Sequence, residues 1–128
     1  MESEFILPKG WKKPTAPISQ AVKKGNMVFV SGQVSRNENL ELVGKGDIKI
    51  QTRQALKNVR TCLEAAGAKM EDVVWVQVFL TDVANLEGYN EVYQEYFPKN
   101  FPARGTLIAK SLANKDYLIE IFTIAVSG

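Results

Sequence analysis

The strongest constraint on the fold of this chain is an apolar segment near its C-terminal end, Tyr117 to Val126. Successive side chains of an extended strand point to opposite faces, so this segment has two faces. One face is Leu118, Glu120, Phe122, Ile124 and Val126, and the other is Tyr117, Ile119, Ile121, Thr123 and Ala125. Both are largely apolar, as are both faces of the segment 73–80. Strands of this composition require cover on both sides of their sheet.

Other segments also carry strand or loop signals. The run Met27–Ser31 follows a Gly-Asn turn, and 104–110 follows a connection stiffened by proline, so both are predicted strands. Residues 1–20 hold three of the five prolines, so we expect an irregular, extended segment with at most one short strand. The polar stretch Ser35 to Gly46 has the composition of a loop.

Two segments have the apolar spacing of amphipathic helices. The first begins at Asp47, ends before Gly67 and spans about five turns, with an apolar stripe of Leu56, Val59, Leu63 and Ala66. The second is expected to be capped by Asn85 and stopped by Pro98. The predicted order is strand, helix, strand, helix, strand, strand. It indicates one α+β domain over 1–128, with a mixed sheet and two helices packed on one face.

Two helices cover only one face of such a sheet. We therefore expect another copy of the chain to bury the other face, in a closed homo-oligomer with a pocket at the subunit boundary. The alternative is that the N-terminal segment or a long loop folds across this face.

The residue inventory excludes several kinds of site. The 128 residues include no histidine, which excludes catalytic triads and metal sites built on histidine. Cys62 is the single cysteine, so no internal disulfide forms, and we expect a core residue in a protein of the reducing cytoplasm. The net charge of +2 with scattered lysines gives nucleic acid no support as a partner. No apolar stretch is long enough to cross a membrane.

Glu120 is the one ionisable group between Tyr117 and Val126, on the same face as several apolar side chains. Burial of a carboxylate raises its affinity for protons, which suits an acid or base near neutral pH. The alternative interpretations are a structural ion pair or a register in which Glu120 reaches solvent.

Arg104 stands where a Pro-stiffened connection becomes a strand. A guanidinium on a rigid support can hold a carboxylate through two parallel hydrogen bonds, although an ordinary surface arginine is the alternative. Ser31 and Gly32, at the end of a strand, offer a hydroxyl and backbone N–H groups to a ligand, or simply form a turn. The aromatic cluster of Tyr89, Tyr93, Tyr96 and Phe97 is interpreted as helix packing.

Several short motifs, in this order along the chain, resemble those of the Rid family, also called YjgF/YER057c/UK114. They are Ser31-Gly32-Gln33, Ala65-Ala66-Gly67, the run Val76 to Asp82, the run Tyr89 to Tyr93 with Phe97, Phe101-Pro102-Ala103-Arg104, and Ile119-Glu120-Ile121 with Ile124-Ala125-Val126. The resemblance implies a chorismate-mutase-like fold assembled as a homotrimer, with sites in the clefts between subunits.

The resemblance also implies an activity. The enamine/imine deaminase branch of the family limits metabolite damage by hydrolysing reactive 2-imino acids, such as 2-iminobutanoate and 2-iminopropanoate or its enamine 2-aminoacrylate, to 2-keto acids and ammonia. By this resemblance Arg104 clamps the substrate carboxylate and Glu120 positions the water. Ser31, Gly32 and Asn90 match positions that line the family pocket. No metal or organic cofactor is implied.

The chain departs from the family pattern at two places. Ile18 stands where an aromatic hydroxyl is frequent, and Gly105-Thr106 replaces a frequent Ser-Cys pair. We therefore expect Ile18 and Thr106 to line a less polar pocket that accepts bulkier or more apolar imino acids. Two other functions stay open: a module that binds a 2-keto acid without turnover, and an endoribonuclease or translation inhibitor.

Overall fold

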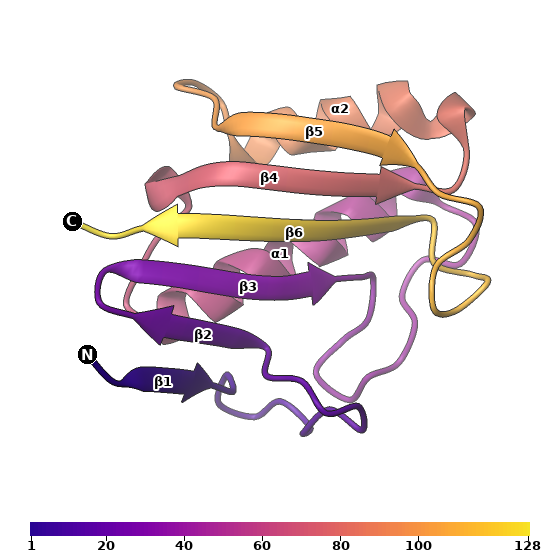
Figure 1. Cartoon of the computed structure of the whole chain (residues 1–128). Helices are drawn as coiled ribbons and strands as arrows, with labels where there is room; N and C mark the ends of the chain where they lie inside the picture. Colours follow the sequence, from indigo (N-terminus) through magenta and orange to yellow (C-terminus); the bar gives the residue numbers. More distant parts are fainter.

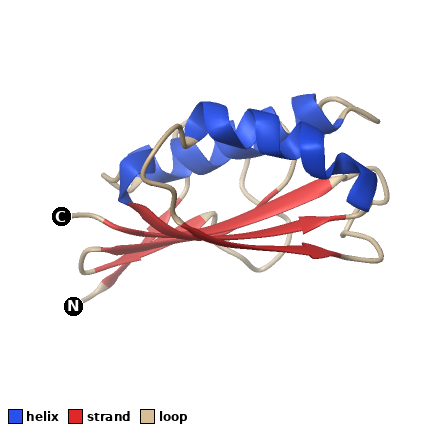
Figure 2. Ribbon diagram, turned by 90° about the horizontal axis from the view of Figure 1, so that it is seen from above, coloured by secondary structure: helices blue, strands red, loops and turns tan.

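The computed structural model describes residues 1–128 as one mixed sheet with two helices on the same face (Figures 1 and 2). The strands lie in the order β1-β2-β3-β6-β4-β5, and only β4 and β5 are parallel neighbours. The strands are β1 (Ser3–Ile6), β2 (Ala21–Lys24), β3 (Met27–Gln33), β4 (Val73–Leu80), β5 (Ala103–Ile108) and β6 (Ile119–Val126); the helices are α1 (Ile48–Ala65) and α2 (Leu86–Tyr96), with short 3-10 turns η1 (Met70–Asp72) and η2 (Val83–Asn85). This confirms the predicted α+β architecture. None of the helices has the length and apolar character needed to span a bilayer.

The hydrophobic core lies between the two helices and the face of the sheet on which they pack (Figure 2). On β6 the buried side chains are Ile119, Ile121, Thr123 and Ala125, which is one of the two faces predicted from the alternation. The helices bury Leu56, Val59, Leu63, Tyr89, Val92 and Tyr93 against them. Cys62 is fully buried in this core, and burial raises the pKa of its thiol to about 12, so it is an inert core residue.

The helix ends follow the predicted signals with one correction. The side chain of Asp47 accepts a hydrogen bond from the Ile50 N–H (3.0 Å) at the start of α1, and Gly67 takes the left-handed conformation (φ +83°) just after its end. Asn85 does precede α2, but its side chain forms no cap. Asp82 instead caps the preceding turn η2 by accepting from the Ala84 N–H (2.9 Å).

The N-terminal part of the sheet is larger than predicted. Both β1 and β2 were absent from the predicted order of elements, and β1 corresponds to the one short strand allowed in residues 1–20. β2 is a four-residue strand, half of it lysine, and it forms by antiparallel pairing with β3. At the other end, the strands predicted over 104–110 and 117–126 are shorter, because β5 ends at Ile108 and β6 begins at Ile119.

The far face of the sheet is uncovered in the single chain. Trp75, Phe122 and Phe29 retain 36%, 36% and 43% of their exposure there. The N-terminal segment lies beside β2 at the sheet edge, so the part of the alternative that placed this segment across the face is wrong (Figure 1). An apolar face of this extent is typical of a surface that binds a partner.

Candidate functional site

Arg104 is held in place by Tyr89, Asn90 and Tyr93 of helix α2, which together are called the cradle. Arg104 lies on edge strand β5, beside Val76 of β4, on the face that carries the helices. Its guanidinium carbon lies 4.5 Å from the ring centre of Tyr93 and 5.1 Å from that of Tyr89, and Nη1 donates to Oδ1 of Asn90 (2.9 Å). Two aromatic faces and one amide therefore fix a side chain that is otherwise exposed.

The sequence of α2 places the three cradle residues together. Tyr89 and Tyr93 are four residues apart and lie on one helix face, with Asn90 beside them. The Tyr89 hydroxyl also hydrogen-bonds Oγ1 of Thr106 (3.0 Å), which ties the cradle to β5. Burial raises the pKa of Tyr93 to about 12, against the opposing effect of Arg104. Both phenols therefore stay neutral, and the guanidinium remains uncompensated.

The exposed side of Arg104 opens into a hollow of about 450 Å³, lined by Asn90, Tyr93, Gln94, Phe101, Pro102 and Arg104. The three ion pairs of the chain all lie elsewhere, so no carboxylate of the chain neutralises Arg104. A fixed guanidinium with free N–H groups matches the planar, bidentate geometry of a carboxylate. The hollow is therefore suited to the anionic end of a small molecule.

Glu120 lies in a second group of predicted residues, on the uncovered face. Its strand partner is Phe79, and its carboxylate lies beside Gly32 and the Phe122 ring. Burial raises the pKa of Glu120, and the nearby positive charge of Arg36 partly opposes the rise. Glu120 forms no ion pair and is half-buried, so the structural ion pair is wrong and the solvent-facing alternative holds only in part.

Gly32 makes the room that Glu120 and Phe122 occupy. A Cβ atom at this position would lie 2.6 Å from Cζ of Phe122 and would overlap the Glu120 carboxylate. The glycine is therefore required by close approach and not by backbone conformation.

A network of hydrogen bonds fixes the strand end that carries Gly32. Ser31 Oγ donates to the Ser19 carbonyl (2.7 Å), beside the 48%-exposed Ile18. The buried Gln33 amide donates to Gln20 Oε1 (2.9 Å) and to the Ser31 carbonyl (3.1 Å). The Ser31 hydroxyl is thus engaged within the chain, while Ile18 stays accessible.

The predicted site residues form two groups that a single chain does not bring together. Asn90, Arg104 and Thr106 lie at the β5 edge with α2, whereas Ile18, Ser31, Gly32 and Glu120 lie around the end of β3 and the open face. Arg104 pairs with a helix-facing position of β4, and Glu120 pairs with an open-face position, so they point to opposite sides of the sheet.

Sequence reasoning missed the part that Tyr89 and Tyr93 play at Arg104. The aromatic cluster was interpreted as packing, and both rings are indeed buried. The available signal was their i, i+4 spacing beside Asn90, together with an unpaired arginine, but nothing in the sequence alone placed β5 next to α2. The chain contains no cluster of three or more carboxylate or thiol side chains able to hold a metal.

Comparison with known proteins assigns the family. A family model described as Endoribonuclease L-PSP matches residues 11–127. A RutC family protein of Pyrococcus horikoshii is 45% identical over 95% of this chain and 96% of its own length. The 3-aminoacrylate deaminase RutC of Acinetobacter baylyi is 41% identical over 98% of each chain. A solved Rid-family structure from Yersinia pestis, 35% identical, superposes with a TM-score of 0.90 over 98% of this chain and 99% of its own. The chain belongs to the Rid family.

The sheet and helices of this Rid-family chain match those of its relatives over nearly their full length. The motifs that suggested the family from sequence lie in the ordered elements that build both groups of candidate residues. These are the end of β3, helix α2, the start of β5 and the start of β6.

Proposed function

We propose that this protein hydrolyses small 2-imino and enamine acids to 2-keto acids and ammonia, in a cleft between two copies of the chain. The observation that carries the proposal is the Arg104 guanidinium, fixed on Tyr89, Tyr93 and Asn90 with no carboxylate of the chain to neutralise it. A rigid cation at a small hollow is the group that a 2-imino carboxylate requires for orientation.

The arrangement of the two groups supports a site shared between copies. A ring of identical subunits joins two different surface patches at every interface, so the Arg104 edge of one copy meets another patch of the next. The exposed apolar face that carries Glu120 needs cover, and a neighbouring copy supplies it. We propose a homotrimer in which Arg104 of one copy and Glu120 of the next face one cleft.

The proposed reaction needs one water and no cofactor. Arg104 holds the substrate carboxylate, and the Glu120 carboxylate accepts a proton from water as the water oxygen bonds to the imine carbon. The C=N double bond becomes a single bond as its nitrogen takes up this proton from Glu120, which gives a carbinolamine. Glu120 then accepts the hydroxyl proton of the carbinolamine, the C–O bond becomes the keto group, and the C–N bond breaks as the nitrogen leaves with that proton as ammonia. The raised pKa of Glu120 favours its return of the proton to the departing nitrogen.

The walls of the cleft favour apolar substrates. Ile18 is exposed beside the Ser31–Ser19 contact, and the rings of Phe79 and Phe122 flank Glu120 edge to face, with centres 5.9 Å apart. Thr106 and Asn90 supply the polar groups on the Arg104 side. We propose that imino acids with larger apolar side chains react faster than 2-iminopropanoate.

The deaminase relative from Acinetobacter baylyi supports the reaction class, and a coupled assay tests it. An amino acid oxidase or a dehydratase generates the imino acid, and keto-acid release is followed with and without the protein. We expect acceleration that Arg104→Ala abolishes and Lys57→Ala, on the exposed face of α1, leaves intact. Unchanged keto-acid release with every imino or enamine acid contradicts the proposal.

Calorimetry separates the alternative of a binding module. Binding of 2-ketobutyrate that persists in Glu120→Ala, without turnover by the natural chain, favours a carboxylate-binding module. The family model's description as an endoribonuclease raises a third outcome. The net charge of +2 and the absence of histidine weigh against it, and RNA cleavage that copurifies with the protein and is lost in Arg104→Ala would favour it.

A further inference from the structure

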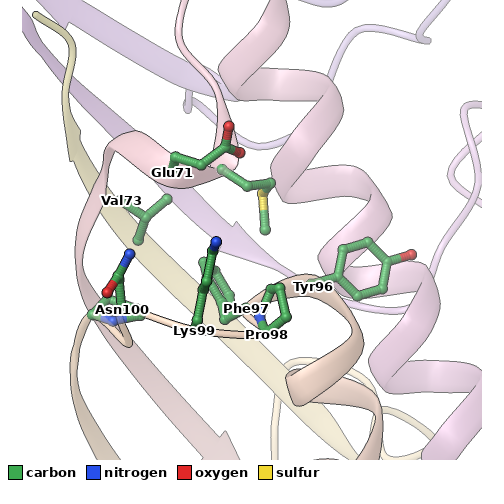
Figure 3. Close-up of a pocket in the computed structure, with 9 residues that line it drawn as sticks. Glu71, Val73, Tyr96, Phe97, Pro98, Lys99 and Asn100 are labelled. Carbon is green, nitrogen blue, oxygen red and sulfur yellow. The ribbon is translucent and has the colours of Figure 1, made fainter.

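A second hollow lies beside the connection that follows α2 (Figure 3). It shares Pro102 with the hollow at Arg104, but Arg104 does not line it. Its volume is about 350 Å³, within the range of small-molecule sites. It is lined by Met70, Glu71, Val73, Tyr96, Phe97, Pro98, Lys99, Asn100 and Pro102. Met70, Val73 and Phe97 are buried and form an apolar floor. No part of the proposed deaminase mechanism uses this hollow.

Two opposite charges stand at the rim of this hollow. Glu71 comes from turn η1 and Lys99 from the connection after α2, and Lys99 extends toward η1 across the hollow (Figure 3). Neither belongs to any of the three ion pairs of the chain, so each head group is free to bind a ligand. Asn100 adds an amide to the lining and holds a left-handed backbone conformation (φ +53°).

We propose that this hollow binds an apolar α-amino acid as its zwitterion. The ligand carboxylate pairs with Lys99, its ammonium pairs with Glu71, and its side chain packs on Phe97 and Val73. An apolar acid or an apolar amine alone would leave one of the two rim charges without a partner, so it binds less tightly. A leucine-sized molecule fits the volume.

The hollow is close to the Arg104 cradle but separate from it. The Phe97 ring on its floor lies 4.7 Å, centre to centre, from the Tyr93 ring, whose face carries Arg104. The Phe97 and Tyr93 rings thus lie between the two hollows, which share only Pro102, and Arg104 does not line the second. Binding there stands independently of the deaminase proposal, because Arg104→Met removes the first site and leaves the second.

The test is a residue-resolved NMR titration of the full chain with three probes: L-leucine, 4-methylpentanoate and 3-methylbutylamine. We expect L-leucine to shift amide resonances in 70–73 and 97–102, and each truncated probe to bind about two- to fivefold more weakly. Lys99→Met and Glu71→Gln weaken L-leucine by a similar factor. The matched exposed variants Lys57→Met and Glu64→Gln on α1 leave it unchanged.

Three results would overturn the proposal. The first is the absence of shifts in these segments up to about 50 mM L-leucine, a concentration above the dissociation constant of even weak specific binding. The second is equal binding of all three probes, which would remove the role of the paired charges. The third is loss of the L-leucine shifts in Arg104→Met, which would place the ligand at the first hollow. The probe comparison uses the natural chain, so it does not depend on any variant folding.

Discussion

Replacing Gly32 with alanine tests the geometry around Glu120 most sharply. The added methyl group would lie 2.6 Å and 2.7 Å from two ring carbons of Phe122 and would overlap the Glu120 carboxylate. Both side chains must therefore move. Overpacking costs about 1–3 kcal/mol in a closed core, and in the proposed assembly these side chains border the substrate cleft, where they have room to rotate. We expect the free energy of unfolding to fall by only about 1 kcal/mol.

The expected effect of Gly32→Ala on the reaction is much larger than its effect on stability. A carboxylate displaced by about 1 Å from its reacting position costs about 100-fold in rate, so kcat/KM should fall by about that factor. Urea denaturation measures the first quantity, and the coupled imino-acid assay measures the second. Binding of 2-ketobutyrate to Arg104, in the other residue group, should weaken less than about threefold.

Gly88→Ala is the matched control for Gly32→Ala. Its added Cβ lies 2.9 Å from a methyl carbon of Ile48, a comparable crowding far from Glu120. Gly88 lies in the first turn of α2, where the gain in helix propensity, at most about 1 kcal/mol, offsets part of the crowding. Stability should thus change little and activity should stay within about twofold. Full activity in Gly32→Ala, or an equal loss of activity in both variants, would refute the reasoning.

Four further predictions concern Tyr93, Arg36, Glu120 and Gln51. Tyr93→Leu should raise KM about fivefold by removing the ring under Arg104, whereas Tyr93→Phe keeps it. Since Arg36 opposes the raised pKa of Glu120, Arg36→Gln should move the acid limb of the kcat/KM profile to higher pH. A carboxyl with a raised folded-state pKa loses its stabilising effect as pH rises, so Glu120→Gln should stabilise the chain more at about pH 7 than at about pH 4 in urea titrations. Gln51→Leu removes buried side-chain bonds to Gly44, Asp116 and Leu118, and denaturation should show a loss of about 3 kcal/mol.

The fold was predictable where local signals and burial agree. The alternation of 117–126 and 73–80 and the apolar stripe of α1 are read directly from the sequence, and all three elements form. The N-terminal strands were missed because β2 is short and lysine-rich, and its pairing with β3 is a tertiary event. The cap by Asp82 was missed because Asp and Asn are both favoured N-cap residues. The sequence does not show which of Asp82 and Asn85 has the backbone conformation that lets its side chain accept the capping hydrogen bond.

The site was predictable by residue type but not by arrangement. An arginine after a rigid turn and a carboxyl on an apolar strand stand out in the sequence alone. That they lie on opposite faces follows from the register of β4 with β5 and β6, which a single sequence does not encode locally. The Tyr89 and Tyr93 rings were interpreted as helix packing. Aromatic residues show the same helical spacing in the sequence whether they only pack in the core or also contact a guanidinium.

Mixing two inactive variants tests the shared cleft most directly. Arg104→Ala and Glu120→Ala are each expected to be inactive, and equal amounts are refolded together so that copies assort at random. If each site takes its guanidinium from one copy and its carboxyl from the next, about one quarter of the sites regain both groups. The mixture should then recover about a quarter of the natural activity. A mixture as inactive as its two components would contradict the account.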